Sequence, residues 1–138
     1  LQSGELIYDS NQLVGGSFII DMKSLTCTDL SGEYKGKLEG HLKSDDFFAV
    51  NKFETASLSI AKINKIKSNS HSITADLTIK GITKTINFEA EVGKNNLNAI
   101  IKIDRTQFGV KYGSGNFFDD LGDNMIYDEF ELKVNLEI

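Results

Sequence analysis

Period-two alternation of apolar and polar residues is the feature that most constrains this chain. Four runs show it plainly, and each is long enough for a strand: 73–80, 86–93, 97–103 and 130–138. In the first run, apolar side chains at 73, 75, 77 and 79 alternate with Thr, Asp, Thr and Lys. Such a pattern predicts strands that turn one face to a dry interior and the other to water.

Three earlier strands are predicted at about 5–9, 13–23 and 53–66, and the links between strands are mostly short. Seven antiparallel strands with a shared apolar face must close on themselves or pack against a second layer. The helical part of the chain is too small to cover a flat sheet. We therefore expect an all-β protein, an antiparallel β-barrel of about eight strands. Seven lie in residues 1–138, and one is expected before Leu1 because seven strands leave two unpaired edges.

One segment, 32–48, breaks the alternation. Tyr34, Leu38 and Leu42 recur every four residues, which is helical spacing. Ser44 is predicted to be the N-cap of a second short turn that directs Phe47 and Phe48 inward. We expect one or two short helices across one end of the sheet.

Composition excludes several classes of protein. The longest apolar run is 47–50, far below the roughly 20 residues of a membrane-spanning helix, so no transmembrane segment is expected. The net charge is −5 and no basic cluster stands out, which argues against a nucleic-acid partner. A single cysteine, Cys27, excludes an internal disulfide and a cysteine-based zinc site.

Four segments distributed over the chain resemble the YceI-like family: 15–22 (GGSFIIDM), 40–48 (GHLKSDDFF), 76–84 (DLTIKGITK) and 103–110 (IDRTQFGV). The resemblance implies one domain over residues 1–138, an extended lipocalin-like barrel with an elongated apolar pocket. It also implies a periplasmic or secreted protein that binds, stores or transports a polyisoprenoid or related long-chain lipid, without catalytic residues or a cofactor. The chain departs from the family in two ways: a His-containing opening strand is absent, and Thr85 replaces a common proline.

The inward strand positions, the helical segment and the residues after the sixth strand supply the candidate ligand-binding side chains. They are Phe18, Ile20, Leu42, Phe47, Phe48, Leu58, Ile60, Leu77, Ile79, Phe88, Ala90, Ile101, Ile103, Arg105, Phe108, Phe130 and Leu132. The alternative is that they fill a packed core, in a barrel that acts as an extracytoplasmic protein-interaction module. Periodicity does not distinguish a filled interior from a lined one.

Arg105 is the only arginine, against 14 lysines. A guanidinium binds a phosphate or carboxylate with two parallel hydrogen bonds, so Arg105 is a candidate anchor for a polar lipid head at the barrel mouth. The alternative is a structural ion pair with Asp29 or Asp104.

The remaining chemistry-bearing residues give weaker signals. His41 and His71 share no helical or hairpin spacing, and no carboxylates are identified beside them, so we predict no metal site. The listed inward strand positions are apolar, so we predict no catalytic residue. Phe108, Tyr112, Phe117 and Phe118 are expected to cover or plug one barrel end. A homodimer is left open.

Overall fold

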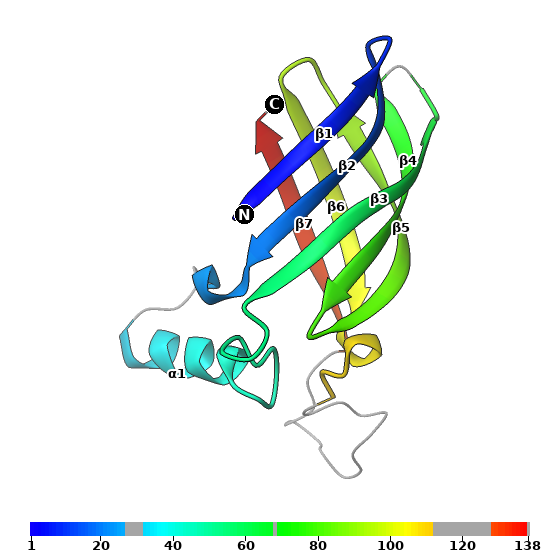
Figure 1. The fold of residues 1–138 in the computed structure, drawn as a ribbon. Coiled ribbons are helices and arrows are strands. Elements are labelled where there is room, and N and C mark those ends of the chain that lie inside the picture. The colour runs from blue at the N-terminus through cyan, green and yellow to red at the C-terminus, as the bar shows by residue number, and fades with distance from the viewer. Residues whose placement is uncertain (27–31, 68, 112–127, 138) are drawn as a thin grey trace.

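The computed structural model describes residues 1–26, 32–67, 69–111 and 128–137. Within these ranges seven strands form one antiparallel sheet in which each strand pairs with its neighbours in sequence (Figure 1). They are β1 (Ser3–Asp9), β2 (Gln12–Asp21), β3 (Thr55–Lys65), β4 (Ser70–Ile79), β5 (Ile82–Val92), β6 (Asn96–Asp104) and β7 (Glu129–Glu137). The predicted all-β, antiparallel fold class is confirmed.

The sheet curls into a half-barrel, with β1 and β7 as its two edges (Figure 1). Both edge strands run in the same direction, and no pairing joins them in the described part of the chain. Only a strand that runs the opposite way would pair antiparallel with both edges. The strand predicted before Leu1 would have this direction, and it stays a prediction.

The inner face of the sheet carries the core, as the alternation predicts. Along β4 every second side chain from Ile73 to Ile79 is buried, and Ala75 is fully inaccessible. The pattern continues across the register: Leu77 lies opposite Leu58 of β3, and both are buried. Register is strongly specified in such strands, because a shift by one residue would turn the whole apolar row to solvent.

In the described part of the chain, one α-helix and two 3₁₀ turns accompany the sheet: α1 (Gly32–Lys43), η1 (Met22–Ser24) and η2 (Arg105–Phe108). The helix predicted from the four-residue spacing is present, and it lies beyond the lower ends of β2 and β3 (Figure 1). Leu38, on the predicted apolar stripe, is 38% exposed, so α1 does not bury that stripe completely.

Ser44 precedes the predicted second turn, but its side chain does not form the predicted N-cap. The Ser44 hydroxyl donates to the carbonyl oxygen of His41 at 2.6 Å, and the amide of Phe47 donates to the Ser44 carbonyl. The Ser44 hydroxyl therefore binds the C-terminal end of α1, where the carbonyls lack helical partners, while the Ser44 carbonyl oxygen begins the next turn.

Candidate ligand-binding groove

Two cavities lie against the inner face of the half-barrel. The first, of about 310 Å³, is lined by Leu1, Phe18, Ile20, Leu58, Ile60, Ile73, Leu77, Phe88, Leu97, Ala99, Ile101 and residues 132–136. The second, of about 590 Å³, is lined by residues 20–22, Ser24, Leu25, Leu42, Phe47, Phe48, Ala56, Leu77, Ile79, Arg105, Glu129, Phe130 and Leu132.

Three side chains, Ile20, Leu77 and Leu132, line both cavities. The cavities are therefore adjacent on the inner face, and we call the two together the inner groove. Its walls are almost entirely aliphatic and aromatic. Burial of hydrocarbon against such walls is favourable by about 25 cal/mol per Å² and needs no particular orientation.

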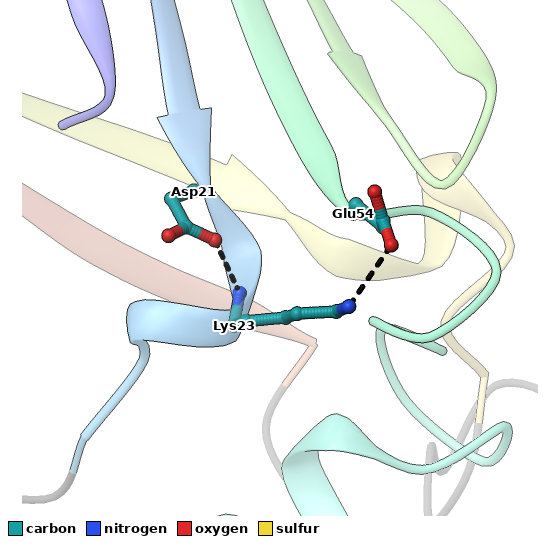
Figure 2. Close-up of polar contacts among 3 residues, drawn as sticks. All are labelled: Asp21, Lys23 and Glu54. Carbon is teal, nitrogen blue, oxygen red and sulfur yellow. Dashed lines mark hydrogen bonds and ion pairs between the residues drawn. The ribbon is translucent and has the colours of Figure 1, made fainter.

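The rim of the second cavity is held by polar contacts between η1 and the start of β3. Figure 2 shows the amide of Lys23 donating to Asp21 Oδ1 at 3.0 Å, and Lys23 Nζ pairing with Glu54 Oε1 at 2.9 Å. The amide of Met22 also donates to the Glu54 carbonyl. These bonds fix the 3₁₀ turn that carries Met22 and Leu25 to the edge of the groove.

Arg105 is buried in the wall of the second cavity, with only 4% of its surface exposed. Its Nη1 donates to the carbonyl oxygen of Val110 at 2.9 Å, and its guanidinium lies 5.6 Å from the centre of the Phe47 ring. Burial lowers the pKa of Arg105 from its ordinary value, while Asp128 and Asp104 oppose that change. An arginine nevertheless remains cationic at neutral pH.

These contacts support the structural alternative for Arg105, with Asp104 as one of the acidic neighbours. Asp104 also caps η2, because its carboxylate accepts the amide of Thr106 at 2.9 Å. Asp29, the other predicted partner, lies outside the described residues. The protein itself thus engages the guanidinium at this end of the inner groove.

All of the candidate ligand-binding residues line the inner groove except Ala90, Ile103 and Phe108. Those three are packed within the hydrophobic core. Phe108 reaches the core because η2 turns it back beneath the sheet, where it is 1% exposed. Tyr112, Phe117 and Phe118, the predicted cover of the barrel end, lie outside the described residues, as does Cys27.

Sequence reasoning missed several lining residues. Ile73, Leu97, Val134 and Leu136 continue the inward alternation of their strands, and the same rule would have found them. Met22 and Leu25 follow the end of β2, where a 3₁₀ turn replaces the strand, so alternation gives no signal for them.

The two histidines are far apart in the fold. His41, on α1, pairs with Asp46 at 3.4 Å and packs edge-on against Phe47, with ring centres 4.8 Å apart. His71 lies on β4, in the same inward row as Ile73. Among the described residues, no three His, Cys, Asp or Glu side chains gather as a metal ion would require. No described helix is long and apolar enough to span a bilayer.

Comparison with known proteins decides the family. A model of the YceI-like domain matches residues 2–138. The chain belongs to the YceI-like family. This YceI-like chain is 29% identical over 91 residues to UPF0312 proteins of two Vibrio vulnificus strains, YJ016 and CMCP6. The match covers 64% of this chain and 45% of each relative, so the chain matches less than half of their length.

Solved structures support the same fold. BcnA of Burkholderia cenocepacia superposes with a TM-score of 0.79 at 22% identity, over 99% of this chain and 82% of that one. The YceI protein of Campylobacter jejuni superposes with a TM-score of 0.75 at 22% identity, over 99% and 81%. The sheet described above thus has the same fold as the matching parts of these two proteins.

Proposed function

We propose that this protein binds, and so stores or transports, the tail of a polyisoprenoid or related long-chain lipid in the inner groove. The observation that carries the proposal is that two apolar cavities lie next to each other and share Ile20, Leu77 and Leu132 in their walls. A groove of this shape suits an elongated hydrocarbon better than a compact ligand.

The chemistry of the lining supports a branched hydrocarbon tail. Aliphatic and phenylalanine side chains bury methyl and methylene groups without hydrogen bonds to direct them. Small residues such as Ala56 and Ala99 on the inner face leave room beside the larger side chains. We propose no chemical reaction on the ligand, and a periplasmic or secreted location, as family membership suggests.

The rival function, a protein-interaction module with a packed interior, predicts no apolar channel behind the sheet. The two apolar cavities argue against this rival function, because a packed interior would not contain them. A packed interior would also leave little room for a bulky substitution at Ile20, whereas a lined groove accepts one at the expense of the ligand.

Organic extraction of the purified protein, followed by mass spectrometry, tests the proposal. We expect about one lipid with an isoprenoid or other long hydrocarbon tail per chain. Ile20→Trp should remove most of it, because residue 20 lines both cavities. Its matched control is Ile19→Trp, whose side chain lies on the outer face and is 40% exposed. No lipid in the wild type, or equal loading in both variants, would refute the proposal.

A further inference from the structure

A third cavity, of about 880 Å³, lies at the end of the half-barrel opposite α1. The β1–β2, β3–β4 and β5–β6 hairpins gather at this end (Figure 1). We call it the hairpin-end cavity. Its polar lining includes Lys62, Lys65, Lys94 and His71, and no described Asp or Glu side chain lines it.

The strand register brings His71 and Lys65 together. His71 begins the inward row that continues through Ile73 along β4, and Lys65 of β3 is its direct partner across the sheet. Directly opposed side chains in such a pair have Cβ atoms about 4.5–5.5 Å apart and stand on the same face. Both side chains therefore stand where the inner face opens to solvent.

His71 also carries an unmet hydrogen-bonding group. Its Nδ1 is buried and makes no hydrogen bond with the described part of the chain. Buried polar atoms are nearly always paired in folded proteins, so an isolated one calls for a partner from outside the chain. An oxygen acceptor fits an imidazole N–H, and an oxyanion also fits the neighbouring ammonium groups.

Charge at this end contrasts with the chain as a whole. The net charge of the protein is −5, yet three lysines surround the hairpin-end cavity. The neighbouring Glu91 lines a separate depression with Ser70 and Asn98. The cavity therefore combines positive charge with hydrogen-bond donors, which is the chemistry that phosphate and carboxylate groups require.

We infer that the hairpin-end cavity binds an oxyanion, a phosphate or carboxylate, as the head of an amphiphile whose tail lies in the inner groove. The tail part of this inference rests on the proposed function. The inner rows support the connection: Ile60 and Ile73 line the groove, and the next inward side chains, Ile63 and His71, line the hairpin-end cavity.

Calorimetric titration with three probes separates the contributions of head and tail: farnesyl diphosphate, farnesol and inorganic diphosphate. We expect farnesyl diphosphate to bind about tenfold more tightly than farnesol, since each exposed ion pair contributes a factor of about two to three. Equal affinity for the two lipids, with no binding of inorganic diphosphate, would overturn the anion site while leaving the tail groove intact.

A pair of variants locates the site. The double variant His71→Gln with Lys65→Gln should abolish most of the tenfold difference in affinity between farnesyl diphosphate and farnesol. The affinity for farnesol itself should not change. The matched control is Lys102→Gln, on an exposed outward position of β6. It changes the net charge and should keep at least half of that difference in affinity. An equal loss in the control would mean that overall charge, and not this cavity, recognises the anion.

The imidazole NMR signals provide a test that does not depend on a tail. Inorganic diphosphate should shift the ring signals of His71 and leave those of His41, at the other end of the molecule, unchanged. A shift with inorganic diphosphate but no preference for farnesyl diphosphate would assign the site to a free anion and refute its role as a head site. No shift and no preference would refute the anion site. If neither lipid binds but His71 shifts, the proposed function fails and the anion site stands.

Discussion

The two ends of the inner face are built from the same alternating strands, yet they use polar side chains differently. At the η2 end the charged group of Arg105 is buried, donates to Val110 and lies over Phe47. At the hairpin end the Nδ1 of His71 has no partner among the described residues. A polar group that the fold satisfies contributes to stability, whereas a buried one left without a partner costs free energy until a ligand supplies that partner. Mutation should therefore damage stability at one end and binding at the other.

Phe47→Ala should have the largest effect on stability. The ring is 4% exposed and packs against His41 and the Arg105 guanidinium, so truncation removes buried contacts and leaves a cavity. We expect the free energy of unfolding to fall by about 4 kcal/mol, measured by urea denaturation. Leu38→Ala, on the exposed side of α1, should cost less than about 1 kcal/mol. If both variants lower the free energy of unfolding by a similar amount, the contacts of Phe47 at the η2 end do not contribute specially to stability.

Arg105→Leu should have the second-largest effect and lower the free energy of unfolding by about 3 kcal/mol. It leaves the Val110 carbonyl and the nearby Asp128 without the buried cation. Chemical denaturation measures it, beside Lys102→Leu as an exposed control that should change stability by less than about 0.5 kcal/mol. A loss below about 1 kcal/mol would show that Arg105 is not a structural part of this end.

Lys23→Ala should lower the free energy of unfolding by about 0.5 kcal/mol. The Lys23–Glu54 pair of Figure 2 is exposed on both sides, and such pairs are weak. Because salt screens exposed charges, the difference between wild type and variant should largely vanish at about 1 M NaCl. A difference that persists at high salt would mean that Lys23 stabilises the rim by packing and not by charge.

His71→Leu should cause no loss of stability and should raise the free energy of unfolding by about 1 kcal/mol, because it removes a buried Nδ1 that has no partner among the described residues. The thermal midpoint and the urea midpoint measure it. If His71→Leu destabilises the protein as strongly as Arg105→Leu, the two ends do not differ in the way described.

The sequence predicts the strands well because one rule, alternation, acts over most of the chain. The inward rows through Leu77 and Ile101 follow from it, and both residues line the inner groove. The four-residue spacing also predicts α1. Ser44 lies between α1 and the next turn, and its side chain binds the end of α1 although the sequence predicts that it caps the next turn. Local pattern does not indicate which turn needs the bond more.

The hairpin-end cavity lay beyond the reach of sequence reasoning. Lys65 and His71 are separated by the turn between β3 and β4, and their pairing depends on the bulge between Ile60 and Lys62, which alters the register. Without that bulge, alternation from Ile60 would place Lys65 on the outer face. The role of Arg105 was equally hidden, because its hydrogen bond to Val110 exists only once η2 forms.

Intermolecular nuclear Overhauser effects between a bound isoprenoid alcohol such as farnesol and the protein methyl groups test the central claim most directly. The account predicts contacts from the tail to Leu77, which lines both cavities, and to Ile101, on the inner face of β6. Ile100, the adjacent residue on the outer face, is 56% exposed and should show none. Contacts to Ile100 without contacts to Leu77 would place the lipid outside the half-barrel and contradict the account.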